Sequence, residues 1–166
     1  MVPIISIIGW AGSGKTTLLE KIIIELKKRG YKIGVVKHSS HDFEIDYPKK
    51  DSWRHKKAGA DSVIVSGSRK ISLIKSLEKE LNLEEIAEKY LNDMDLILTE
   101  GYKVSDKPKI LVLDAIIGNE FSYEKQVDNL IAIVSSKKIK SDLPQFNPNQ
   151  IKEITDCIEK KIIKKT

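Results

Sequence analysis

The chain has 166 residues, of which 40% are apolar, so it has the size of one ordinary domain and can bury a full core. Its net charge of +5 suits anion binding, but its arginines are only Arg29, Arg54 and Arg69, which argues against a reader of nucleic-acid bases. The single cysteine excludes an internal disulfide, and the short apolar opening without a basic segment favours a soluble cytoplasmic protein with no signal peptide or membrane span.

The first 36 residues have the order and length of a strand–helix–strand unit. Residues 4–8 form a continuous β-branched run, typical of a strand buried on both faces. After a glycine-rich segment, apolar residues recur at helical spacing from Leu18 to Leu26, and Gly30 ends the predicted helix. Residues 32–36 predict a second buried strand, parallel to the first.

The rest of the chain continues the alternation of strands and helices. We expect a polar loop at 37–50, a short helix capped by Asp51 or Ser52 and running through Ala58, and a hairpin of Ser62–Val65 and Ile71–Ile74. A helix at 83–91, buried strands at 95–99, 109–113 and 130–134, and a last helix from near Pro148 follow. This order predicts a single α/β domain over residues 1–166, with a mainly parallel sheet flanked by helices and the hairpin as an antiparallel addition.

The glycine-rich segment carries the phosphate-binding pattern G-x-x-x-x-G-K-[ST]. Its glycines allow positive φ angles, so that successive N–H groups can surround phosphate oxygens at the start of the helix. Its lysine suits the β- and γ-phosphates, and its threonine hydroxyl suits Mg²⁺. The predicted nucleotide-binding residues are Gly12, Ser13, Gly14, Lys15, Thr16 and Thr17, with Thr16 as a metal ligand.

A magnesium–nucleotide site also needs an acidic group, and DLILTEG offers Asp95 and Glu100 at opposite ends of one predicted strand. The carboxyl ends of parallel strands share the edge where the phosphate-binding segment lies. Glu100 is at that end, whereas Asp95 is roughly 16 Å away at about 3.3 Å per residue. We therefore predict that Glu100 binds the metal or orients water, and that Asp95 begins the strand.

The loop after the second strand reaches the same edge and brings Lys37, His38, His41 and Asp46 toward the nucleotide. Because carboxylates suit Mg²⁺, Asp46 is a further candidate for metal binding, and for catalysis beside Lys15 and Glu100. The two histidines are candidate ligands or proton carriers, with a surface role as the alternative. The basic run KKDSWRHKK at 49–57 is either a solvated face or a site for an anionic substrate or partner.

Three classes of phosphate-binding protein fit this pattern to different degrees. A kinase of a small metabolite normally needs an arginine-rich lid, and no arginine follows Arg69. A switch GTPase often carries N-K-x-D for guanine, whereas the last buried strand is followed here by SSKK at 135–138. An adaptor with slow hydrolysis needs neither feature. The residues favour the adaptor, keep the kinase as the alternative and leave a pure interaction module third.

The chain also resembles the molybdopterin-guanine dinucleotide biosynthesis protein B family. The resemblance covers roughly residues 2–135 and rests on five segments in the family's order: GWAGSGKTTL, VVKHSSHDFEID, KDSWRHKKAGADSVIVSG, DLILTEGYK and PKILVL. The first segment is common to P-loop proteins. The K-H-x-x-H-x-F-x-x-D pattern and the E-G-[YF]-K turn are far more specific.

This resemblance implies a P-loop fold, GTP and Mg²⁺ as ligands, weak GTPase activity and a homodimer. It implies partnership with the guanylyltransferase that makes the molybdenum cofactor dinucleotide, and the basic run would receive that partner or the anionic pterin, molybdopterin. Neither nucleic acid nor a membrane is an expected partner. The functional face that it implies is formed by Lys37, His38, His41, Asp46, Asp51, Ser52 and Glu100.

Two positions depart from the family pattern. Lys49 stands where the family usually has the glycine of P-G-K-D-S, so this turn is expected to differ. Asp114 stands where an arginine usually ends the strand after P-K, so an arginine contact to a phosphate would be missing or supplied elsewhere. A neighbouring role in cofactor assembly therefore stays open.

Overall fold

The structure, a computed structural model, describes residues 1–39, 41–113 and 127–163. The chain divides into two compact units, which are described separately: unit 1 comprises residues 1–38 and 86–166, and unit 2 comprises residues 39–85. The single domain expected over 1–166 stays a prediction. Asp114 lies outside the described residues.

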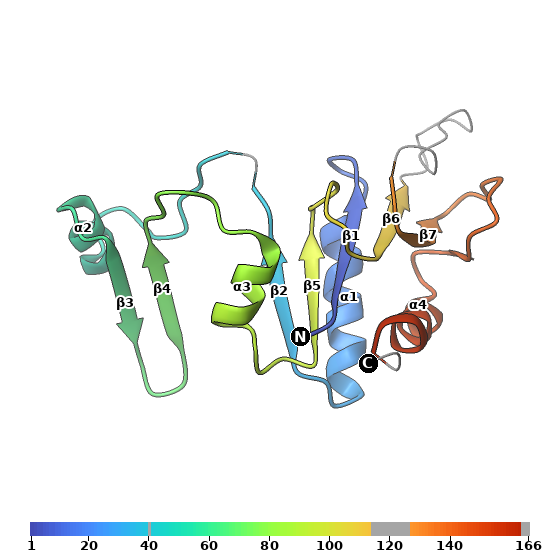
Figure 1. Ribbon diagram of the computed structural model, residues 1–166, viewed down its shortest axis with the longest axis horizontal. Coiled ribbons are helices and arrows are strands. Elements are labelled where there is room, and N and C mark those ends of the chain that lie inside the picture. The colour runs from blue at the N-terminus through green and yellow to red at the C-terminus, as the bar shows by residue number, and fades with distance from the viewer. Residues whose placement is uncertain (40, 114–126, 164–166) are drawn as a thin grey trace. The chain divides into compact units, whose positions relative to one another are not determined.

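Unit 1 is built on a six-stranded sheet with the strand order β2-β5-β1-β6-β7-β8. The strands are β1 (Ile4–Gly9), β2 (Ile33–Lys37), β5 (Leu96–Glu100), β6 (Lys109–Leu113), β7 (Leu130–Ser135) and β8 (Gln145–Phe146). Each neighbouring pair is parallel, so the carboxyl ends lie along one edge, as the arrowheads of β1, β2, β5 and β6 show (Figure 1). The predicted α/β fold with a mainly parallel sheet is confirmed.

Two helices cover one face of this sheet. Helix α1 (Lys15–Lys28) and helix α4 (Ile151–Ile158), which continues as a π-helical segment (Glu159–Ile163), share one buried cluster with strand residues such as Ile5 and Leu98. Ser6 and Thr99 are fully buried in the middle of the sheet, where Thr99 Oγ1 donates a hydrogen bond of 2.9 Å to Ser6 Oγ. The carboxyl ends of the strands are therefore held by a buried apolar core, in which the hydroxyls of Ser6 and Thr99 are hydrogen-bonded.

Arg29, next to the end of α1, ties this helix to α4. Its guanidinium donates to Glu25 within α1 at 3.0 Å, to Asp156 at 2.6 Å and to Glu159 at 3.0 Å. One fork-shaped cation thus satisfies three carboxylates on two helices, a geometry that suits arginine better than lysine.

Unit 2 contains helix α2 (Asp51–Lys57) and an antiparallel pair of strands, β3 (Ser62–Ser66) and β4 (Ile71–Lys75). The predicted hairpin is confirmed. Helix α3 (Leu83–Tyr90) begins within the residues of unit 2 and ends within those of unit 1.

The structure differs from the sequence prediction in three places. Strand β8 was missed, because two residues between Pro144 and the Asn147–Pro148 turn are too few to show a periodic pattern. The last helix is α-helical only as far as Ile158 and continues as the π-helical segment. Lys50 is the N-cap of α2, so the expected cap at Asp51 or Ser52 was wrong; Asp51 is the first helical residue.

In the part of the chain that the structure describes, no helix has both the length and the hydropathy to cross a bilayer.

Candidate nucleotide site

The segment between β1 and α1 forms a tight corner at the carboxyl-end edge of the sheet. A Cβ atom on Gly9 would lie 2.3 Å from the carbonyl oxygen of Val112 and 2.7 Å from Ser13 Oγ, so the position accepts only glycine. Gly12 and Gly14 have φ angles of 75° and 84°, in the left-handed region that glycine adopts without strain. Gly14 is the N-cap of α1 and makes no side-chain cap hydrogen bond, so the first amides of the helix suit the binding of an anion.

The lysine of the pattern lies across this corner. Lys15 Nζ donates to the carbonyl oxygen of Trp10 at 2.5 Å, and the Ser13 amide donates to the same oxygen at 3.2 Å. Ser13 Oγ is buried and has no hydrogen-bond partner among the described residues. A polar ligand group at the corner would satisfy it, so the corner fits a phosphate.

Thr16 and Glu100 meet at this edge although they are far apart in the sequence. Thr16 Oγ1 donates to Glu100 Oε1 at 2.9 Å, and Lys37 Nζ lies 3.9 Å from the same oxygen. The carboxylate of Glu100 is mostly buried, with 13% of its side chain exposed, whereas Lys37 is exposed. A mostly buried carboxylate beside a threonine hydroxyl offers a pair of oxygen ligands that suits Mg²⁺.

His38 follows Lys37 and continues the pairing of β2 with β5. Its amide donates to the Glu100 carbonyl oxygen at 3.1 Å, and its ring lies 4.9 Å from the Tyr102 ring, centroid to centroid. Tyr102 has a φ angle of 56°, so the turn after β5 folds back toward His38. His38 is predicted from the sequence, whereas Tyr102 is not, because its only signal is its place in the E-G-[YF]-K turn.

The other acidic residue of the same strand lies at the far edge. Asp95 Oδ2 accepts a hydrogen bond of 2.7 Å from the amide of Lys32, just before β2. Asp95 therefore lies just before β5, which begins at Leu96, one residue later than expected, while Glu100 ends the strand at the phosphate-binding corner.

His41 and Asp46 belong to unit 2, and the structure places them with that unit. The His41 carbonyl oxygen accepts from Ser39 Oγ at 2.7 Å, and Asp46 Oδ1 accepts from the Tyr47 amide at 2.9 Å. Unit 1 therefore brings together Thr16, Glu100, Lys37 and His38, and the ligand roles of His41 and Asp46 stay predictions.

Within the described residues, no group of three or more histidine, cysteine, aspartate or glutamate side chains could hold a metal ion by itself. Mg²⁺ usually takes only one or two protein ligands and completes its shell with phosphate oxygens and water. The Thr16–Glu100 pair therefore fits this ion better than it fits a transition metal.

A cavity of about 260 Å³ opens beside the corner. Ser13, Gly14 and Thr17 line it on the side of α1, and Val112, Ser136 and Pro148 line it at the ends of β6, of β7 and of the segment before α4. The cavity adjoins the phosphate-binding residues, and its lining is both polar and apolar, which suits the binding of a nucleoside.

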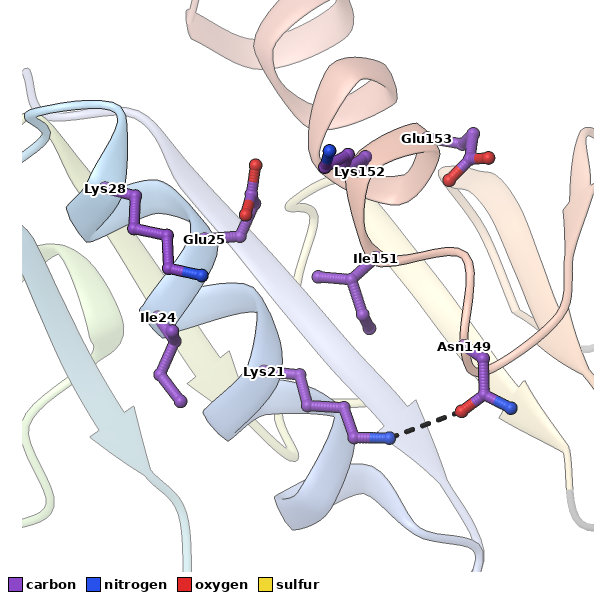
Figure 2. A pocket seen from close by; sticks show the side chains of 8 residues that line it. All are labelled: Lys21, Ile24, Glu25, Lys28, Asn149, Ile151, Lys152 and Glu153. Atoms are coloured by element: carbon purple, nitrogen blue, oxygen red, sulfur yellow. Dashed lines mark hydrogen bonds between the residues drawn. The ribbon is translucent and has the colours of Figure 1, made fainter.

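A second hollow, of about 400 Å³, runs between α1 and the start of α4 (Figure 2). Lys21 lines both hollows and donates to Asn149 Oδ1 at 3.4 Å, drawn as the dashed line. Glu25 on its wall is already bound by Arg29, and Ile24 is 56% exposed. This groove carries no set of groups suited to catalysis.

Comparison with known proteins finds consistent similarities. The family model of molybdopterin guanine dinucleotide synthesis protein B matches residues 4–136. The chain is 34% identical over 160 residues to the molybdopterin-guanine dinucleotide biosynthesis adapter protein of Haemophilus influenzae, covering 95% of this chain and 88% of that protein. It is 34% identical to the Escherichia coli protein of the same name, covering 95% and 92% of the two chains.

Solved structures show the same similarity in three dimensions. The crystal structure of Bacillus subtilis MobB superimposes with a TM-score of 0.76 at 28% identity, covering 95% of this chain and 96% of that one.

Proposed function

The chain belongs to the molybdopterin guanine dinucleotide synthesis protein B family, and from this premise we propose that it is a GTP-binding adaptor in molybdenum cofactor biosynthesis. Its partner would be the guanylyltransferase that attaches the guanine nucleotide to molybdopterin. The relatives named as adapter proteins support this role, and the observation that carries it is the hydrogen bond of 2.9 Å between Thr16 and Glu100 at the glycine corner.

The residues of the corner would share the work of binding GTP. The amides of residues 12–17 would hold the phosphates, Lys15 would neutralise charge on the β- and γ-phosphates, and Thr16 with Glu100 would hold Mg²⁺. When bound, the ion would screen the negative charge of the triphosphate. The cavity beside Ser13 and Ser136 would take the nucleoside.

Hydrolysis, where it occurs, would be slow. Glu100 is the carboxylate at the corner that could orient a water molecule, and no arginine follows Arg69 to stabilise the charge of the transition state. The catalytic and metal roles predicted for Asp46 are kept as a proposal that Asp46→Asn tests, because loss of Mg²⁺-dependent GTP binding in that variant would support them. We further propose that the protein works in the cytoplasm.

A homodimer is part of this proposal, with a second copy of the chain as the occupant of the hairpin surface. Large apolar side chains of β3 and β4 are exposed, among them Ile64 at 59% and Ile71 at 68%. A two-stranded sheet is only marginally stable alone, so an extended apolar surface on it favours association. The family resemblance, which implies a homodimer, supports association of two copies.

The test is calorimetric titration of the full chain with GTP and with ATP in the presence of Mg²⁺. GTP should bind more tightly than ATP, and Lys15→Ala should abolish binding. Lys28→Ala, on the last turn of the same helix and away from the corner, should leave affinity unchanged. Failure of both nucleotides to bind, or an unchanged affinity in Lys15→Ala, would contradict the proposal. Phosphate release without an acceptor would separate a GTPase from a kinase.

A further inference from the structure

A hollow in unit 2 is lined by none of the unit 1 residues that form the phosphate-binding corner. It measures about 620 Å³, within the range of pockets that hold small molecules, and its walls all come from residues 42–76. The loop 42–46 forms one wall, Trp53, Lys56 and Lys57 of α2 form another, and residues 73–76 of β4 and its end form the third.

We propose that this pocket binds a 2-amino-4-oxopyrimidine ring system that carries a phosphate. This chemistry is shared by a pterin and by guanine, the two ends of the dinucleotide that names the family. The choice of ring rests on the proposed function, whereas the pocket itself does not depend on the nucleotide corner.

Charge is divided between the walls of the pocket. The loop contributes three carboxylates, Asp42, Glu44 and Asp46, and the opposite elements contribute the ammonium groups of Lys56, Lys57 and Lys75. Such a pocket suits a ligand with hydrogen-bond donors at one end and a negative charge at the other. An aminopyrimidinone with a phosphate has this polarity.

Asp46 supplies the acceptor for the donor end, a role that competes with the metal role kept for it above. Its Oδ1 accepts from the Tyr47 amide, while Oδ2 is buried and has no hydrogen-bond partner among the described residues. An unpaired buried carboxylate oxygen is costly. The adjacent ring N–H and amino group of an aminopyrimidinone would satisfy it, since a carboxylate accepts two parallel donors well.

Trp53 and the lysines supply the remainder of the site. Trp53 is half-buried, with Lys57 Nζ 5.6 Å from its ring centroid, and its flat surface suits stacking with a planar heterocycle. Lys57 and Lys75 are exposed at the pocket and would bind the phosphate. Lys56 has a different task, because its Nζ donates to Ala60 O at 2.6 Å and to Ser76 Oγ and so joins α2 to the end of β4.

The experiment titrates the full chain with 6-hydroxymethylpterin monophosphate, followed by pterin fluorescence, and with GMP, followed by calorimetry in the Lys15→Ala variant. We expect saturable binding of at least one probe, with tighter binding of the pterin identifying it as the natural class and tighter binding of GMP identifying guanine. The doubly substituted Lys57→Gln, Lys75→Gln variant should weaken binding at least tenfold. Lys70→Gln, in the same unit but outside the pocket, should not change it.

Two further variants test the walls. Trp53→Leu and Asp46→Asn should each weaken binding about tenfold or more, while Asp61→Asn, outside the pocket, should have no effect. The exposed lysines keep the test valid if Trp53→Leu fails to fold. Absence of binding by both probes, or binding that the lysine and tryptophan variants leave intact, would overturn the proposal. Loss of GTP binding with pterin binding intact would instead refute the nucleotide site alone.

Discussion

The two units use similar β-branched strands in opposite ways. In β1, the five residues from Ile4 to Ile8 are all buried. Ile5 and Ile7 share a cluster with residues of α1 and α4, and Ile8 belongs to a second cluster with Leu111 and Val127. In β3 only Val63 is buried, and β4 has no buried residue, although it contains two isoleucines. The same residue type therefore stabilises unit 1 through burial and leaves unit 2 with an apolar surface.

An apolar run therefore specifies a strand, but it does not specify whether another element packs over that strand. Unit 1 has the residues for a second layer, α1 and α4, within its own sequence. Unit 2 has one short helix without a buried residue, too little to cover a two-stranded sheet. Its exposed apolar residues form the surface on which we propose that a second copy of the chain binds.

The difference in burial between the two units can be tested by truncating one isoleucine in each sheet. Ile5→Ala removes a fully buried side chain from the core of unit 1 and should lower the free energy of unfolding by about 2–5 kcal/mol. Ile71→Ala, at a position 68% exposed, should lower it by less than about 1 kcal/mol. Urea unfolding of both variants measures the difference, and equal losses would show that unit 2 is buried in solution.

Lys109 tests how unit 1 tolerates a buried charge. The side chain is 1% exposed, and Nζ donates to the carbonyl oxygens of Ser105, Lys107 and Asp128. Lys109→Met leaves these oxygens without their donor and should cost about 1–3 kcal/mol. The exposed Lys57→Gln of unit 2 should cost less than about 0.5 kcal/mol in the same urea titration.

The difference in free energy of unfolding between the native chain and Lys109→Met should depend on pH, with a sign that follows from the pKa of Lys109. Burial lowers the pKa of Lys109 in the folded chain below its ordinary value of 10.5. Between the folded and the unfolded pKa the unfolded chain binds more protons, so stability from this group rises with pH in that window. The gap between the native chain and Lys109→Met should widen as pH approaches 10.5, and a gap that narrows would contradict the burial effect.

Lys49 allows backbone strain in unit 2 to be tested. This residue, which stands where the family pattern usually has glycine, has a φ angle of 74°, so its left-handed conformation is strained. Lys49→Gly should stabilise unit 2 by about 0.5–1 kcal/mol, measured by thermal unfolding. Lys50→Gly is the matched control, because its φ of −68° is unstrained and glycine there should not stabilise.

The smallest effect on stability is expected on the hairpin surface. Ile64→Lys should change the free energy of unfolding of the monomer by less than about 0.5 kcal/mol, because the side chain is 59% exposed. It should nevertheless shift the chain from dimer to monomer in light scattering. Ile24→Lys, at an exposed isoleucine of α1, should leave the dimer intact, and a dimer that survives Ile64→Lys would exclude the hairpin as its interface.

Much of the site in unit 1 could be predicted because it depends on chain direction. In a parallel sheet, the residue that ends a strand must lie at the same edge as the residue that starts the next helix. Glu100 and Thr16 meet for that reason. The contact of His38 with Tyr102 and the capture of Lys15 by the Trp10 carbonyl oxygen depend on turn geometry, which the sequence pattern did not specify.

The sequence by itself determined the order along the chain of the strands and helices other than β8, the glycine corner, and the edge of the sheet at which Glu100 lies. These features follow from periodicity and from the direction of each strand. Only the tertiary structure decided which apolar strands are covered, that Lys49 takes a left-handed turn and that Asp46 lines a pocket with Trp53. These features depend on how separate segments pack, and the residue pattern of one segment does not specify which other segments will contact it.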